Sequence, residues 1–284
     1  MDRELLLLLL VLLLCGPTLV AFGWWPAGED DLGDALRLER RRWRRLWVPL
    51  LPALVGVGVL AGWAVMEPDA AEPLPSLAVL VATALALIPL RALCRAIFSM
   101  AARTSAPVMT VGLWRPHIVF SPALRAVVDD EVAMAIWEHE AAHLRHRDPL
   151  RIWLGQLATD LQWPWPQARR RFESWLEALE LARDDEARRH GADGLDLSAG
   201  ILAAASFHSF GSAAGNPAVA ALLHRPSLSL RRRMDRLFAS LSPEPVPSSR
   251  WPLWLVVGAL FFTALVFGLS CGESLLHALL ASRC

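Results

Sequence analysis

The sequence predicts a mostly helical α+β protein in which four transmembrane helices flank one cytoplasmic domain. Hydrophobic residues make up 55% of the 284-residue chain and the mean hydropathy is +0.37, which favours a membrane protein. Four apolar runs approach the roughly 20 helical residues that cross a bilayer. The predicted spans are residues 5–25, 46–66, 74–98 and 251–270.

The distribution of arginine predicts the orientation, because the chain contains no lysine. The first connection holds RLERRRWRR (37–45), whereas the second, EPDAAEPLPS (67–76), holds no arginine. Positive residues favour the cytoplasmic side, so we expect the first connection inside and both termini outside. The first run is long and weakly basic for a signal peptide, so a retained span is expected. The predicted parts are a membrane region (1–103), a cytoplasmic domain (104–249) and a last span with a short external tail (250–284).

The charge balance and the cysteine pattern limit the classes of ligand and metal site that the chain is expected to have. Acidic and basic residues balance, so no direct binding to nucleic acid is expected, and RLERRRWRR is interpreted as a topology signal that contacts anionic membrane lipids. The four cysteines include no CxxC pair, which excludes a zinc ribbon. Cys271 and Cys284 fall on the predicted external side, where a disulfide between them is left open.

The middle domain should begin with two short strands and continue as helices. Apolar runs at 108–113 and 117–120 surround Arg115-Pro116 and predict a β-hairpin. A helix should start at Asp129 or Asp130 and end near Asp148-Pro149. Further helices are expected before the WPWP break, over residues 168–190, and in the basic segment after LHRPS.

The stretch WEHEAAHL in the first of these helices carries a candidate metal site. Histidines four residues apart lie on one helix face, so His139 and His143 can bind one ion. Glu140 is rotated by about 100° from His139, a position suited to a base beside an activated water. Chance yields the pattern in about one chain in a hundred, but the mainly apolar flanks argue against an exposed polar turn.

Catalytic zinc usually has three protein ligands, so a third is needed. His146 lies about 10.5 Å further along the helix axis than His139, too far for three imidazoles to converge. A later helix offers an acidic stripe, which is alternatively a solvated face paired with arginines. The members of this stripe are Glu173, Glu177, Glu180 and Asp184.

Three ordered motifs resemble the BlaR/MecR-type membrane zinc metallopeptidases, which are distant relatives of the HtpX-type proteases. GLWRPHIVFSPAL is similar to that family's strand pair, HEAAHLRHRD to its HExxHxxxxD, and ELARDDEA to its ExxxD element. The similarity covers residues 107–237 and the arrangement of spans. It implies a zinc-dependent endopeptidase.

The resemblance also implies roles for individual residues. Zinc would be bound by His139, His143 and Glu180, with Glu140 as the catalytic base. Asp184 would orient a ligand histidine through its free ring nitrogen, and Asp148 would have a structural role. Extended substrate would pair with the first strand, at Thr110, Val111, Gly112 and Leu113.

The group that stabilises the oxyanion is less defined, because the chain has no tyrosine. His224 and Arg225 lie in HRPSL, which is similar to a segment near the HtpX active site, but an ordinary loop explains them equally well. Unlike the antibiotic-sensing members of the family, this chain has no penicillin-binding domain after residue 270, so a β-lactam sensor is not supported.

Regulated proteolysis is therefore the expected function, with a protein or peptide as substrate and a winged-helix transcriptional repressor as one candidate. An HtpX-like quality-control protease for membrane proteins is an alternative. An inactive receptor or scaffold with a structural zinc site is another, although the retention of Glu140 does not favour it. A transporter with a heavy-metal site would normally carry more ionisable residues in its spans.

Overall fold

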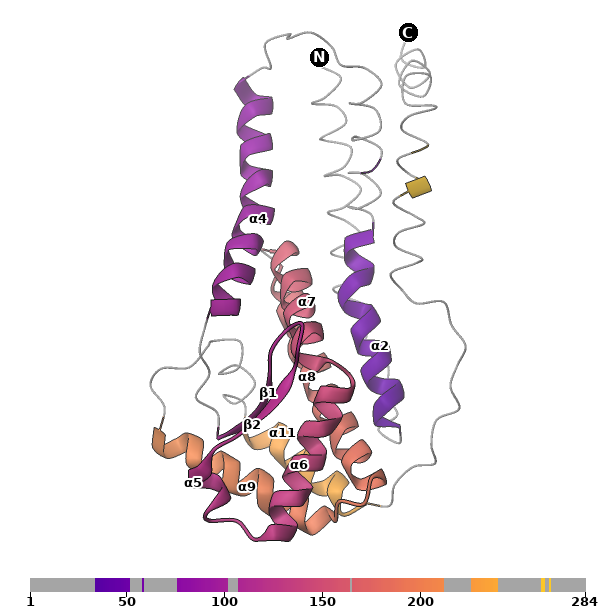
Figure 1. Cartoon of the computed structure of the whole chain (residues 1–284). Helices are drawn as coiled ribbons and strands as arrows, with labels where there is room; N and C mark the ends of the chain where they lie inside the picture. The colour runs from indigo at the N-terminus through magenta and orange to yellow at the C-terminus, as the bar shows by residue number, and fades with distance from the viewer. Residues whose placement is uncertain are drawn as a thin grey trace. The chain divides into compact units, whose positions relative to one another are not determined.

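A computed structural model describes residues 34–51, 58, 76–101, 107–163, 165–211, 226–239, 262–263 and 266. Its elements are α2 (Ala35–Trp47), η1 (Val48–Leu50), α4 (Ser76–Ala101), β1 (Val108–Val111), β2 (His117–Phe120), α5 (Pro122–Arg125), α6 (Asp130–Arg145), α7 (Asp148–Leu161), α8 (Pro166–Arg189), α9 (Gly194–Gly211) and α11 (Pro226–Leu237), shown in Figure 1. The chain forms two compact units, of which the helical unit comprises residues 28–46 and 91–246, and the other comprises 1–27, 47–90 and 247–284.

The predicted fold class, with four transmembrane helices, is wrong. Within the part of the chain that the structure describes, no helix is both long and apolar enough to cross a membrane. The span predicted at 74–98 coincides with α4, which contains Pro89. Arg91 and Arg95 of α4 lie 3.5 and 3.1 Å from the carboxylate of Asp160 on α7, and hydropathy cannot reveal such ion pairs.

Other sequence predictions fall on residues outside the described ranges. These are the whole span at 5–25, most of the spans at 46–66 and 251–270, and the cysteines Cys271 and Cys284. The orientation and the contact with anionic lipids stay predictions.

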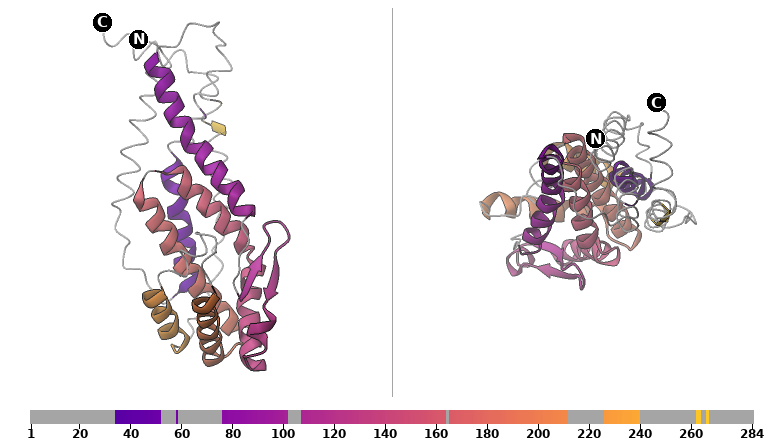
Figure 2. Two further views of the ribbon diagram at one scale, coloured as in Figure 1. Left: turned by 90° about the vertical axis from the view of Figure 1, so that its left-hand side faces the viewer. Right: turned by 90° about the horizontal axis from the view of Figure 1, so that it is seen from above.

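The predicted hairpin is confirmed. Strands β1 and β2 pair antiparallel, with Val108 opposite Phe120 and Val111 opposite His117. Gly112 begins the turn with φ +98°, and a Cβ there would lie 2.6 Å from the carbonyl oxygen of Arg115. Only glycine fits this backbone without strain. The hairpin packs against α6 (Figure 1, Figure 2).

Helix α6 begins where the sequence predicts and is followed almost at once by α7. Asp129 precedes the helix in an extended conformation, and Asp130 and Glu131 lie in its first turn, where negative charge suits the helix dipole. His146 ends α6, and Arg147 adopts a left-handed conformation with φ 52°. This two-residue connection turns the chain sharply, so α7 starts at Asp148 close to the end of α6.

Close helix approach creates the core around α6 and α8. A Cβ on Gly200 of α9 would lie 2.5 Å from Cγ1 of Ile136 on α6, and one on Gly155 of α7 would lie 3.0 Å from the Phe172 ring of α8. Trp175 of α8 is fully buried beside Phe172. The glycines therefore let α9 and α7 approach the two helices that carry the acidic and histidine residues.

The arginine-rich segment 37–45 lies in a helix of the helical unit. Ala35 of α2 packs with Leu181 and Ala182 of α8, and the guanidinium of Arg42 donates to the carbonyl of Ser174 at 2.6 Å. The sequence did not reveal this packing, because the run of arginines hides the buried face of α2.

Candidate metal centre

Two histidines and one glutamate converge between α6 and α8. The Nε2 atoms of His139 and His143, one turn apart on α6, lie 3.1 Å from each other. The carboxylate oxygens of Glu180 on α8 lie 3.5 Å from Nε2 of His139 and 3.7 Å from Nε2 of His143. Both histidines are buried, and Glu180 is partly exposed. These three side chains can hold a metal ion.

The two imidazole nitrogens are spaced as the ligand atoms of a tetrahedral metal ion are. With metal–nitrogen bonds of about 2.0–2.1 Å, ligand atoms of a tetrahedral ion lie about 3.3 Å apart. The 3.1 Å between the two imidazole nitrogens lies close to this value, and each oxygen of Glu180 lies near one of them, Oε2 at 3.5 Å from His139 and Oε1 at 3.7 Å from His143. Two imidazoles and one carboxylate form a common ligand set of catalytic zinc, which leaves the fourth position for water or substrate.

A carboxylate contacts the other ring nitrogen of each histidine. Nδ1 of His139 lies 2.9 Å from Oδ1 of Asp184 on α8, and Nδ1 of His143 lies 2.9 Å from Oδ2 of Asp148 at the start of α7. A carboxylate that accepts a hydrogen bond from Nδ1 of His143 favours the tautomer that carries its proton there, which leaves the lone pair at Nε2 of His143.

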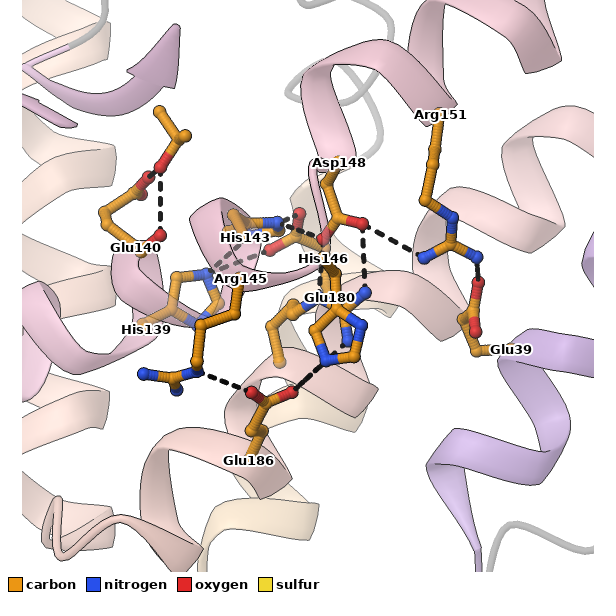
Figure 3. A network of polar contacts seen from close by, with 12 residues as sticks. Glu39, His139, Glu140, His143, Arg145, His146, Asp148, Arg151, Glu180 and Glu186 are labelled. Carbon is orange, nitrogen blue, oxygen red and sulfur yellow. Dashed lines mark hydrogen bonds and ion pairs between the residues drawn. The ribbon is translucent and has the colours of Figure 1, made fainter. Parts of the chain in front are cut away.

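Arginines in turn hold Asp148. Arg183 of α8 donates to both of its oxygens, with the NH2–Oδ1 contact at 2.9 Å, and Arg151 donates to Oδ1 at 3.0 Å. Burial alone would raise the pKa of Asp148, but His143 and Arg183 hold it well below its usual range. Asp148 is therefore ionised and fixed. Figure 3 shows it between His143 and Arg151.

Arg233 of α11 supports the other half of the site, a role that the sequence did not predict. Its guanidinium binds both oxygens of Asp184 at 2.8 Å and lies 3.0 Å from Oε2 of Glu180. Burial alone would raise the pKa of Glu180, but Arg233 and both histidines lower it. In RRRMDR several arginines are adjacent, and only an amphipathic pattern hints that one of them faces inward.

The electrostatics favour a cation beside His139. Burial alone would lower the pKa of this imidazole, but the carboxylates of Asp184 and Glu180 raise it to about 10. The same negative charges would stabilise a divalent metal at Nε2. Metal binding would then displace a proton from His139.

Glu140 lies beside the three candidate ligands, and it is held by the hairpin. Its carboxylate oxygen Oε2 lies 2.8 Å from the hydroxyl of Thr110 on β1, and that hydroxyl lies 3.0 Å from the Glu140 carbonyl. Glu140 is 8% exposed. In Figure 3 a dashed line joins its carboxylate to a neighbouring hydroxyl and none joins it to His139, His143 or Glu180.

The other predicted residues are placed as follows. Thr110 and Val111 lie on β1, Gly112 and Leu113 in the following turn, and His224 and Arg225 outside the described residues. His146, which the helix spacing excludes as a ligand, pairs with Glu186 at 2.7 Å.

Comparisons with protein-family models, with curated proteins and with solved structures find no match to this chain.

Proposed function

We propose that the chain is a zinc-dependent endopeptidase. The observation that carries the proposal is the convergence of His139, His143 and Glu180, with a carboxylate at the second nitrogen of each histidine. Outer carboxylates of this kind accompany metal-binding histidines. Glu140, next to the first ligand in sequence, supplies the base that hydrolysis needs.

Zinc, when bound, supplies Lewis acidity that polarises a carbonyl and lowers the pKa of water toward 7. The Glu140 carboxylate accepts the proton of the attacking water and delivers it to the nitrogen of the departing amine. Thr110 positions that carboxylate through its hydroxyl. Asp148 keeps the imidazole of His143 in the tautomer that binds metal, and Asp184 holds a negative charge beside the imidazole of His139.

Strand β1 supports a peptide as the substrate. It pairs with β2 along one edge, and no third strand adjoins it within the described residues. An extended peptide can add to such an edge by backbone hydrogen bonds, and Thr110 places the strand beside Glu140. The segment Thr110–Leu113 would therefore bind the substrate. Among protein substrates, the resemblance favours a winged-helix repressor.

The test compares two glutamates that lie on either side of His139 in the sequence, in the purified full-length chain loaded with zinc. Glu140→Gln should slow cleavage of casein by about 100-fold or more, with zinc content unchanged. Glu138→Gln is the matched control, because Glu138 is on the same helix but pairs with Arg145, and it should cleave within about twofold of wild type. Equal rates for Glu140→Gln and wild type would remove Glu140 as the base. Bound zinc without any cleavage would indicate a structural metal site.

A further inference from the structure

Helix α2 brings a buried carboxylate into the helical unit. Glu39 is 3% exposed, and its Oε1 accepts a hydrogen bond of 2.9 Å from Nε1 of Trp175. The same oxygen accepts a hydrogen bond from Arg151 of α7. A buried charge is costly unless it is paired, and the contacts of Glu39 explain how it is retained.

Arg151 connects Glu39 to the candidate metal centre. One of its terminal nitrogens contacts Glu39, and the other contacts Oδ1 of Asp148 at 3.0 Å. Its guanidinium lies 5.1 Å from the ring centre of Trp43 and 5.7 Å from that of Trp175. Asp148 then contacts Nδ1 of His143. Figure 3 shows this continuous path from Glu39 to His143.

The charges around Asp148 explain how Glu39 affects the hydrogen bond to His143. Asp148 contacts two guanidinium groups, those of Arg151 and Arg183, and it must also accept from His143. Glu39 neutralises Arg151 from the opposite side. Without that carboxylate, Arg151 would be a partly buried and poorly compensated charge that either draws Asp148 toward itself or leaves its position beside the rings of Trp43 and Trp175. Both changes alter the hydrogen bond that orients His143.

We propose that Glu39 is a positioning residue for the metal centre, acting through Arg151 and Asp148 on His143, so that docking of α2 controls metal affinity. The proposal rests on the metal site proposed above but not on peptidase activity. Separation of α2 from α7 and α8 would remove Glu39 and weaken the site.

The experiment measures zinc affinity of the full-length chain by competition with a chromophoric chelator, together with the visible spectrum of the cobalt-substituted protein. Glu39→Gln should weaken zinc binding by about tenfold, as loss of an outer partner does, and should change the cobalt spectrum. Asp34→Asn is the matched control. It also removes one carboxylate charge near α2, but Asp34 caps the start of that helix through the amide of Arg37, and asparagine retains the cap. It should leave both measurements unchanged.

A double-mutant cycle tests whether Glu39 acts on the metal centre through Arg151. If Glu39 acts through Arg151, Arg151→Gln should weaken zinc binding, and adding Glu39→Gln should have little further effect. The coupling is obtained only where all four proteins of the cycle fold, and the zinc affinity and cobalt spectrum of folded Glu39→Gln test the role of Glu39 without the cycle. The positioning role alone would be overturned if Glu39→Gln kept wild-type zinc affinity and an unchanged cobalt spectrum while His143→Ala lost zinc binding. A wild-type chain that binds no metal would overturn both proposals, whereas metal binding without peptidase activity would leave this one standing.

Discussion

Nδ1 of His143 lies 2.9 Å from the carboxylate of Asp148, only five residues further along the chain. The contact is possible because the chain reverses at Arg147 in a left-handed conformation. A short sequence thus contains a candidate ligand, the group that orients it and the turn that brings them together.

Replacing Asp148 with asparagine should weaken zinc binding by about 10–100-fold, because the amide cannot favour the same tautomer of His143. The free energy of unfolding should also fall by about 3–5 kcal/mol, since Arg183 would lose its charged partner while buried. Chelator competition and urea unfolding measure the two effects. Wild-type zinc affinity in a folded Asp148→Asn protein would contradict the role assigned to Asp148.

The turn at Arg147 can be tested by its backbone preference. Glycine adopts positive φ freely, whereas a β-branched residue does so with strain. Arg147→Gly should therefore retain or raise the free energy of unfolding, and Arg147→Val should lower it by about 1–2 kcal/mol. Thermal unfolding of the two variants side by side gives the comparison, and equal stability would argue against the left-handed turn.

Gly200 should be intolerant of a side chain, because a Cβ would lie 2.5 Å from Cγ1 of Ile136. Gly200→Ala should cost about 1–3 kcal/mol of unfolding free energy through overpacking between α9 and α6. Removing the opposing side chain in the Gly200→Ala, Ile136→Ala double variant should give less destabilisation than the sum of the two single changes. Simple additivity would show that the two residues do not touch.

The ion pairs of Glu186 predict a pH dependence. Burial alone would raise the pKa of this carboxyl, but His146 and Arg145 lower it from 4.5 to about 2. A carboxyl group whose pKa is lower in the folded state than in the unfolded chain stabilises the fold at pH values above the unfolded pKa. That contribution is lost as the pH falls from about 4.5 through about 2.

Glu186→Gln should therefore flatten the acid dependence of the unfolding free energy in this range, by roughly 3 kcal/mol. Urea unfolding of metal-free protein at several pH values measures the difference. Parallel curves for variant and wild type would contradict the assigned ion pairs.

The sequence was informative where short periodic patterns bring residues together. The four-residue spacing of His139 and His143 places both on one helix face, and the same spacing separates Glu180 from Asp184. The hairpin at 108–120 follows from its apolar runs and its turn. In each case neighbours along the chain are neighbours in space.

Contacts between distant segments were not predictable in this way. Glu39 is 112 residues from Arg151, and Arg233 is 49 residues from Asp184, so neither partnership leaves a local pattern. The span predicted at 74–98 falls on α4, whose Arg91 and Arg95 pair with Asp160 of α7. These partners are likewise more than 60 residues apart in the sequence, so the hydropathy of one segment does not register them.

The most direct test of the metal centre compares zinc binding by the full-length wild type with that of two variants of α8. Glu180→Gln removes the proposed third ligand. Glu177→Gln changes a glutamate on the same helix that pairs with Arg232 instead. Wild type and Glu177→Gln should each bind one zinc ion with equal affinity, and Glu180→Gln should bind it at least 100-fold more weakly. Equal zinc affinity in all three proteins would contradict the proposed ligand set.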